Sequence, residues 1–141
     1  ADLKQANLGR AKLKKADLTR AKLKKAILKK ANLKDAKLIR ADLTDAQLNY
    51  AVLERANLRN SKLRKANLND TKLKGANLTN AINVSLAYTL NGAKLFGATL
   101  PDGYDQAWFE SQGATFAIPE LSTYALFIGG LSFMLVAQRR S

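Results

Sequence analysis

The chain of 141 residues contains no cysteine and no histidine, and its 24 basic residues far outnumber its 11 acidic ones. Without these two residue types there are no disulfides, thiolate nucleophiles or imidazole metal ligands, so the usual zinc and acid–base sites cannot be built. The lack of cysteine leaves the redox compartment open. There is also no glycine-rich phosphate loop and no paired-acid motif. The sequence therefore predicts a protein that is not an enzyme and that holds no cofactor or metal.

Residues 1–80 consist of one five-residue word that is repeated sixteen times, beginning with ADLKQ in residues 1–5. The third residue of the word is always leucine, and the first is alanine except at Ser61 and Thr71. A strict period of this kind determines the architecture before any local propensity is considered.

A period of five fits neither the 3.6-residue repeat of an amphipathic helix nor the two-residue alternation of a strand. At about 100° per residue, successive leucines would spread around a helix and form no apolar stripe. A coil that turns one corner every five residues avoids this problem, because each side then points one leucine and one small residue inward. The Asp or Asn before the leucine is also more typical of turns than of strands. The alternative is a low-complexity helix rich in Lys, Leu and Ala.

Eight of the sixteen words in residues 1–80 follow the full pattern of Ala, Asp or Asn, Leu and two variable residues, and the run resembles the motif of the pentapeptide-repeat family. Residues 93–103 resemble it weakly. The resemblance implies an all-β fold, namely a right-handed quadrilateral β-helix with four repeats per coil. This domain would span residues 1–103, regular over 1–80 and irregular over 81–103. Some members of the family imitate duplex DNA with an acidic surface, and the basic outward residues of this chain disfavour that activity.

Basic residues are concentrated in the sixteen words, which hold 21 Lys and Arg against seven Asp and Glu. In a quadrilateral coil, residues twenty apart stack on adjacent rungs. The column that begins Asp2, Lys22, Asp42 alternates in sign and is stabilising, as is a second one that contains Lys15, Asp35 and Arg55. Other columns stack like charges without compensation. The candidate anion-binding residues come from three of these: Arg10, Lys14, Arg20, Lys30, Lys34 and Arg40.

The uncompensated columns, which also include Lys4 over Lys24, have two interpretations. A basic surface fits an anionic polymer such as nucleic acid, acidic polysaccharide or lipid headgroups. Alternatively, the charges keep the protein soluble and prevent edge-to-edge stacking of coils. Tyr50 is the one aromatic residue among the words, so stacking of single-stranded bases has little support.

After the sixteenth word the pattern is lost, and it returns at Ala93, two residues out of phase. A loop or bulge in between would allow one more coil to form. Residues 104–117 are rich in aromatic residues, and we expect them to cap or link the end of the coil, with Trp108 and Phe109 packed on the last leucine rung. The alternative is that these aromatics form a ligand site. At the other end, the missing cap and initiator methionine before Ala1 predict a processed or truncated product.

Residues 118–141 form a tail that predicts a hydrophobic sorting or anchor helix. Residues 121–137 carry no charge and reach the lower length limit for a membrane span. The arginines that follow place the C-terminus in the cytoplasm by the positive-inside rule. The alternative is a helix buried against the end of the coil.

The order of residues in this tail is a Pro-Glu pair, an apolar run with paired glycines and an arginine cluster. Over residues 118–140 it resembles the PEP-CTERM protein-sorting signal of Gram-negative bacteria, although Leu121 stands where that signal has a second proline. The resemblance implies export and cleavage by an exosortase-type membrane peptidase. The residues expected to act in sorting and processing are Pro119, Glu120, Leu121, Arg139 and Arg140.

Together these features predict a non-enzymatic exported scaffold or interaction protein. It would be anchored in the inner membrane by its C-terminal helix and then reach the cell envelope or extracellular matrix, where its basic surface would hold acidic polysaccharide. The alternative is a basic binding module for nucleic acid or for an enzyme that acts on nucleic acid.

Overall fold

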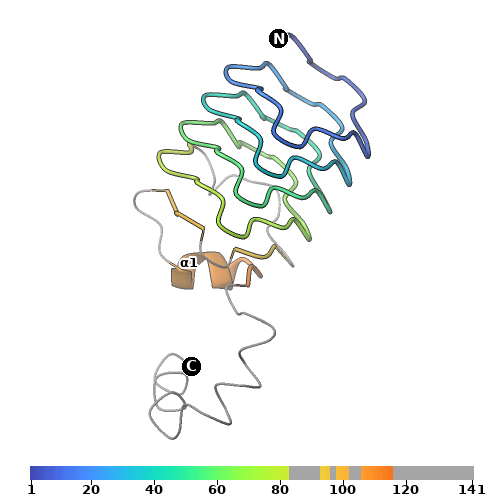
Figure 1. Ribbon diagram of the computed structural model, residues 1–141. Coiled ribbons are helices and arrows are strands. Elements are labelled where there is room, and N and C mark those ends of the chain that lie inside the picture. The colour runs from blue at the N-terminus through green and yellow to red at the C-terminus, as the bar shows by residue number, and fades with distance from the viewer. Residues whose placement is uncertain (83–92, 96–97, 102–105, 116–141) are drawn as a thin grey trace, which may run out of the picture.

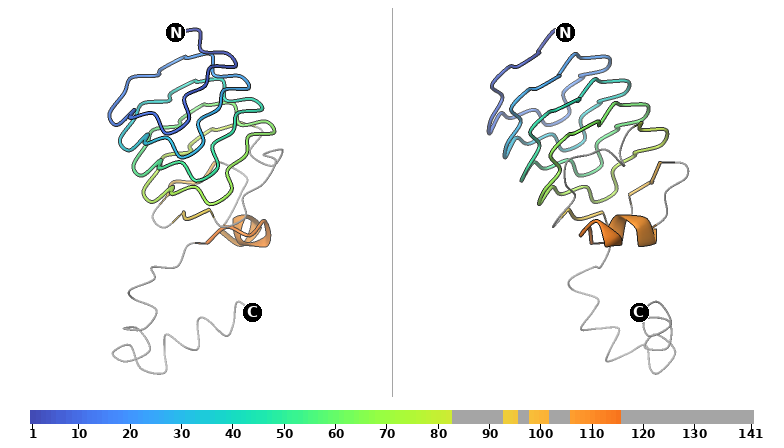
Figure 2. Two further views of the ribbon diagram at one scale, coloured as in Figure 1. Left: turned by 90° about the vertical axis from the view of Figure 1, so that its right-hand side faces the viewer. Right: turned by 180° about the vertical axis from the view of Figure 1, so that it is seen from behind.

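In the computed structural model, the repeats wind into a coil of stacked rungs (Figures 1 and 2). The backbone pairs with the position twenty residues further along, as in the parallel bridges of Asp2 with Lys22 and of Lys22 with Asp42. Four words therefore complete one turn, which makes the stack a parallel β-helix with four sides. The structure describes residues 1–82, 93–95, 98–101 and 106–115.

Every side of the coil has the same local geometry. In the word that begins at Ala21, Lys22 bridges to the rungs on both sides and Leu23 points into the core. The next two residues turn the corner, with φ of 60° at Lys25 and a hydrogen bond from the Ala26 amide to the Leu23 carbonyl at 3.0 Å. This bond, with positive φ at the third turn residue, is typical of a type II turn. The fifth residue of all sixteen words has positive φ, although only one of them is glycine.

The Asp or Asn at the second position of a word stabilises the turn of that same word. The Oδ1 atoms of Asp17, Asn57 and Asn77 accept hydrogen bonds from the backbone amide two residues further on, at 3.0, 3.1 and 2.9 Å. Such Asx turns are the local structure that these two residue types favour. The preference for Asp or Asn in the motif therefore has a structural cause.

The core is a ladder of leucines with alanines between them. From Leu23 to Leu78, the inward leucines are at most 1% exposed, and the alanines of the same words are equally buried. Burial of each such leucine stabilises the fold by about 1.5–3 kcal/mol relative to an exposed side chain. The first rung has a neighbour on one side among the described residues, and three of its leucines are only partly buried: Leu3, Leu8 and Leu13.

Ser61 and Thr71 replace alanine in the core, and both are fully buried. The Thr71 hydroxyl donates a hydrogen bond to the carbonyl oxygen of Leu68 at 2.8 Å. Within the described part of the chain, the Ser61 hydroxyl has no hydrogen-bond partner. Of the two hydroxyl residues that replace alanine, Thr71 therefore has its buried hydroxyl satisfied by a hydrogen bond, whereas Ser61 does not.

Beyond residue 82 the rungs continue with a shifted register. Lys72 bridges to Lys94 and Asn77 bridges to Thr99, so the offset is 22 residues instead of 20. The word that returns in the sequence thus lies on the coil two residues out of phase, as its position predicts. Lys94 in turn bridges to Thr115, which adds a further rung.

The short helix α1 (Gln106–Ser111) lies at the end of the coil opposite the N-terminus (Figure 1). Phe109 is 1% exposed and belongs to the same buried cluster as the leucines, and Trp108 packs against this cluster. The two rings meet edge to face with centroids 5.0 Å apart. Both aromatics therefore contact the apolar core, whereas the assignment of residues 104–117 as a cap stays a prediction.

The predicted hydrophobic tail, residues 118–141, lies outside the described residues. Its anchor helix therefore stays a prediction from the sequence, together with the sorting residues Pro119, Glu120, Leu121, Arg139 and Arg140. Within the described ranges, no helix has the length and apolarity that crossing a membrane requires.

Candidate anion-binding surface

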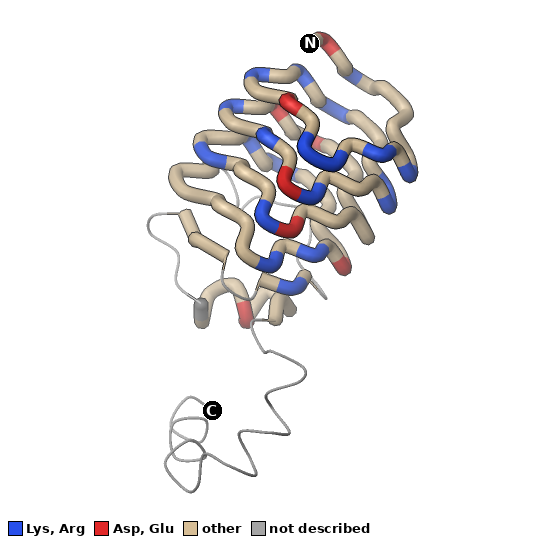
Figure 3. The backbone as a smooth tube through the Cα atoms, viewed as in Figure 1, with Lys and Arg blue, Asp and Glu red and all other residues tan. Residues whose placement is uncertain are grey.

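Each of the four sides of the coil is a stack of words that lie twenty residues apart. In each word the second, fourth and fifth residues lie on the outside, and Figure 3 shows rows of basic positions along the rungs with acidic positions among them. We number the sides by the word that each has in the first rung: side 1 has residues 1–5, side 2 has 6–10, side 3 has 11–15 and side 4 has 16–20.

Two of the predicted basic columns occupy corners of the coil. Arg10 and Lys30 are fifth residues on side 2, and Arg20 and Arg40 are fifth residues on side 4. The Arg10 amide donates to the carbonyl before Lys30 at 2.9 Å, and the Arg20 amide donates to the carbonyl before Arg40 at 2.8 Å. Each pair therefore lies on directly adjacent rungs, which are about 4.8 Å apart.

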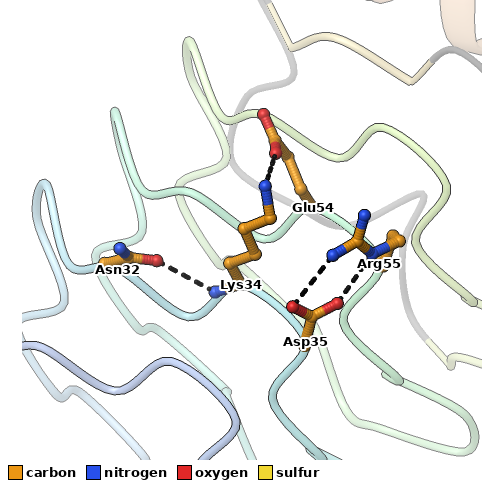
Figure 4. A network of polar contacts seen from close by, with 5 residues as sticks. All are labelled: Asn32, Lys34, Asp35, Glu54 and Arg55. Atoms are coloured by element: carbon orange, nitrogen blue, oxygen red, sulfur yellow. Dashed lines mark hydrogen bonds and ion pairs between the residues drawn. The ribbon is translucent and has the colours of Figure 1, made fainter.

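Side 3 places carboxylates against its basic residues (Figure 4). Arg55 donates two hydrogen bonds to Asp35, from Nε to Oδ1 at 2.7 Å and from Nη2 to Oδ2 at 3.0 Å. Lys34 Nζ lies 3.0 Å from Glu54 Oε2. The hydrogen bond from Arg55 holds the pKa of Asp35 below its usual value, and Asp35 in turn raises the pKa of Arg55. The second and third rungs of this side are thus internally neutralised.

These ion pairs correct one of the predicted basic columns. The sequence predicts Lys14 and Lys34 as an uncompensated pair, and this is wrong for Lys34, because Glu54 on the next rung neutralises it. The prediction considered only the first two rungs of the column. The alternating column that contains Asp35 and Arg55 is confirmed by their paired hydrogen bonds.

Side 1 also has acidic residues between its basic ones. The Oδ2 atom of Asp2 lies 3.7 Å from Lys4 Nζ and 4.0 Å from Lys22 Nζ. Burial by itself would raise the pKa of Asp42, but hydrogen bonds from the residue two positions on, together with nearby lysines that include Lys24, hold the pKa below its usual value. Lys4 and Lys24 therefore each have a carboxylate in their surroundings, and the prediction of this column as uncompensated is wrong for Lys4, which pairs with Asp2.

Sides 2 and 4 lack this neutralisation between the second and third rungs. The second coil, residues 21–40, has eight basic residues and one acidic residue, and the three acidic residues of the third coil, 41–60, all fall on sides 1 and 3. Among the described residues, Arg10, Arg20 and Arg40 take part in none of the ion pairs within 4.0 Å. The outward residues of the third rung on sides 2 and 4 are Gln47, Asn49, Tyr50, Asn57, Arg59 and Asn60.

Lys30 contacts an aromatic ring on the next rung. Its Nζ lies 5.8 Å from the centroid of Tyr50, which is the distance of a cation–π interaction. This contact orients the ammonium group and leaves its charge in place. The column of Arg10, Lys30 and Tyr50 therefore stays positively charged over its first two rungs.

One pair of like charges was not visible in the sequence. Lys72 and Lys94 face each other in a parallel bridge on side 3, and both are exposed. Counting twenty residues from Lys72 leads to Gly92, so the pairing depends on the two-residue shift of register. The sequence feature that could have predicted this pair is Lys94, which stands at the second position of the word that returns at Ala93.

The exposed Lys and Arg side chains of the coil are donors of charge-assisted hydrogen bonds. Among the residues that the structure describes, no cluster of three or more His, Cys, Asp or Glu side chains could hold a metal ion. The whole chain also lacks the histidine and cysteine on which most acid–base and thiolate sites depend. The Lys and Arg side chains of this surface can bind anions through charge-assisted hydrogen bonds.

A sequence model of known families settles which family this coil represents. The model described as pentapeptide repeats (8 copies) matches residues 1–40 and again residues 41–80. The chain belongs to the pentapeptide-repeat family. Pentapeptide-repeat proteins are generally non-enzymatic structural or interaction proteins, and the predicted right-handed β-helix is the fold of this family.

Solved structures of other pentapeptide-repeat proteins are similar to this chain. A protein of the Arabidopsis thaliana thylakoid lumen matches with a TM-score of 0.51 and 25% identity, over 84% of this chain and 73% of its own. HetL, involved in heterocyst differentiation regulation in the cyanobacterium Nostoc sp. strain PCC 7120, matches with a TM-score of 0.44 and 29% identity, over 82% and 57%. Rfr23 of the cyanobacterium Cyanothece 51142 matches with a TM-score of 0.41 and 26% identity, over 82% and 84%. No curated protein matches the chain.

Proposed function

We propose that this pentapeptide-repeat protein is a non-enzymatic scaffold that is exported, is held at the inner membrane by residues 121–137, and binds an acidic polysaccharide through its basic coil. The observation that carries the binding is the pair of corner columns, Arg10 with Lys30 and Arg20 with Arg40. They hold cations on adjacent rungs, and none of the ion pairs of the described residues neutralises them.

Two cations on adjacent rungs are unfavourable by themselves, because like charges opposite each other on neighbouring strands destabilise a sheet by about 0.2–1 kcal/mol. An anion at the corner would contact both cations and reverse the sign of this interaction. Guanidinium groups bind carboxylates with two parallel hydrogen bonds, which suits Arg20 and Arg40 in particular. Since the columns run along the axis of the coil, an extended polymer would contact the cations of both rungs at once.

Export is proposed from the sequence of the tail. The uncharged run of residues 121–137 is followed by Arg139 and Arg140, and the preceding Pro119 and Glu120 stand where the resembled sorting signal is cleaved. Cell fractionation and mass spectrometry of the mature C-terminus test this part. Recovery of the whole protein from the cytoplasm with residue 141 intact would contradict export.

Binding is tested with polygalacturonate, an acidic polysaccharide, by isothermal titration calorimetry at two salt concentrations. A matched pair of variants separates the corner columns from net charge, since each removes four positive charges. Glutamine already occupies the same positions in other words, at Gln5 and Gln47, so it is compatible with both sites. The corner variant is Arg10→Gln, Arg20→Gln, Lys30→Gln and Arg40→Gln. The control variant is Lys22→Gln, Lys25→Gln, Lys62→Gln and Lys65→Gln, on the alternating columns of side 1.

The corner variant should bind polygalacturonate roughly tenfold or more weakly, because each charge-assisted hydrogen bond contributes about 1.5–3 kcal/mol. The control variant should lose only the general electrostatic part and bind about two- to threefold more weakly. Equal losses would mean that net charge alone governs binding. An unmodified protein that does not bind polygalacturonate would refute the proposed ligand.

A nucleic-acid ligand is the second candidate, because the same columns would also fit phosphates. Titration with duplex DNA in the same buffers tests it, and its affinity should fall steeply with salt if phosphate contacts dominate. Tighter binding of duplex DNA than of polygalacturonate, with a loss in the corner variant, would favour this candidate over the polysaccharide.

A further inference from the structure

Side 2 of the coil carries groups that the binding of a simple anion does not require. Its words are residues 6–10, 26–30, 46–50 and 66–70. Basic residues occupy its first two rungs, and an aromatic residue and amides occupy the third. Asp70, at the same corner as Tyr50 on the rung directly after it, is the one acidic residue of these four words. The groups that concern the inference are Arg10, Lys30, Gln47, Asn49 and Tyr50.

Tyr50 is unusual for its position in the coil. The other fifteen corners of the regular coil hold polar residues or glycine, and Tyr50 adopts the same left-handed backbone with φ of 62°. This conformation is unfavourable for a bulky side chain. The ring is also 50% exposed, so it contributes little to the core. The cation–π contact with Lys30 occupies part of the ring, and its exposed surface would suit a ligand that stacks on an aromatic side chain.

The amides beside Tyr50 are available to a ligand. Gln47 is exposed and stands at the second position, where an Asp or Asn would stabilise the turn. Asn49 is partly exposed, and neither amide side chain makes a hydrogen bond to another described residue. An amide offers both donors and an acceptor, as a sugar hydroxyl does, whereas a phosphate backbone only accepts hydrogen bonds.

We propose that side 2 is a saccharide-binding face, which recognises the sugar rings of an acidic polysaccharide as well as its charges. Tyr50 stacks on a sugar ring, Gln47 and Asn49 bond to hydroxyls, and Arg10 binds a carboxylate. Lys30, which already lies over the Tyr50 ring, places its charge beside the stacked sugar. This inference rests on the proposed function and names the face that carries it.

A nucleic acid fits this face less well. Single-stranded nucleic acid is usually bound by several aromatic rings that stack successive bases, and Tyr50 is the one aromatic residue of the sixteen words.

The test compares polygalacturonate with polyglutamate, which has carboxylates without sugar rings. The variants are Tyr50→Asn and the pair Gln47→Ala with Asn49→Ala. Asparagine suits the left-handed backbone, so Tyr50→Asn removes the ring without straining the corner. Tyr50→Phe, which keeps the ring, serves as the matched control, and far-UV circular dichroism verifies that each variant is folded.

Tyr50→Asn and the amide variant should each weaken polygalacturonate binding about five- to tenfold and leave polyglutamate binding unchanged, while Tyr50→Phe keeps most of the affinity. If these variants bind both polymers as the unmodified protein does, while the corner variant binds both more weakly, the saccharide face is wrong and the proposed polyanion binding stands. If Tyr50→Asn weakens the binding of both polymers equally, the proposal that side 2 binds saccharide is also contradicted. A preference for duplex DNA that depends on Tyr50 contradicts it as well. If the unmodified protein does not bind polygalacturonate, both proposals fail.

Discussion

Replacement of the two buried hydroxyl residues by alanine, the residue of the other fourteen words, should change stability in opposite directions. Ser61→Ala should stabilise the coil, because the Ser61 hydroxyl is fully buried and has no hydrogen-bond partner among the described residues. Thr71→Ala should destabilise it, because it removes the hydrogen bond to the Leu68 carbonyl at 2.8 Å and a buried methyl group.

The magnitudes follow from the contacts of each side chain. An unsatisfied buried hydroxyl is unfavourable by about 1–3 kcal/mol, so Ser61→Ala should raise the free energy of unfolding by about 1 kcal/mol. Thr71→Ala loses a net hydrogen bond of about 1 kcal/mol and a methyl group of about 0.8 kcal/mol, and should lower it by about 1–2 kcal/mol. Thr71→Ser, which keeps the hydroxyl, should lose only the part due to the methyl group.

Unfolding in guanidinium chloride measures these changes, with circular dichroism for the coil and fluorescence of Trp108 for its C-terminal end. Coincident curves from the two probes verify that a single transition is followed, which repeat proteins do not guarantee. A change of 1 kcal/mol should move the midpoint by about 0.3 M. If Ser61→Ala is destabilising, its hydroxyl has a partner after all, and the reasoning from the unpaired oxygen is refuted.

Three further predictions concern other parts of the coil. Asp35 and Asp42 have native pKa values below their usual range. The stability that they contribute is therefore complete above the unfolded-state pKa of about 3.9 and is lost as the pH falls through the lower native pKa. Measuring the unfolding midpoint at decreasing pH should show this loss, and the double variant Asp35→Asn with Asp42→Asn should show a smaller one. Lys65→Gly should be about 1 kcal/mol more stable than Lys65→Ala in chemical denaturation, because the corner has φ of 55°; equal stability would exclude backbone strain at the corner. Phe109→Ala should lower the free energy of unfolding by about 3–5 kcal/mol, since Phe109 is 1% exposed in the core. A change below 1 kcal/mol in the unfolding transition followed by Trp108 fluorescence would contradict the packing of Phe109 in the core.

Much of the fold could be predicted from the sequence because the repeat is strict. The leucine and alanine positions identify the inward residues, and the buried ladder from Leu23 to Leu78 is the result. The spacing of twenty residues per coil, implied by the family resemblance, is confirmed by the parallel bridges. The Asp and Asn preference was read as a turn signal, and the Asx hydrogen bonds give its physical cause.

The candidate site was predicted less completely, because whether a basic side chain is neutralised depends on the residues of the rungs on both sides of it. Lys34 has a lysine on the rung before it and Glu54 on the rung after it, and the ion pair with Glu54 changes its role. The contact of Lys30 with Tyr50 likewise depends on side-chain conformations that the column alone does not specify.

The sequence by itself determined the inward residues, because the strict period marks one leucine and one small residue in every word. The family resemblance added four repeats per coil and hence the identity of the columns, which the parallel bridges confirm. The tertiary structure decided which charges remain uncompensated. That depends on the rungs that lie next to each other and on where a side chain reaches, as the pairing of Lys34 with Glu54 and the register of Lys72 with Lys94 demonstrate. The columns of Arg10 with Lys30 and of Arg20 with Arg40 keep their charge because the third rung offers them amides and a tyrosine where sides 1 and 3 offer carboxylates.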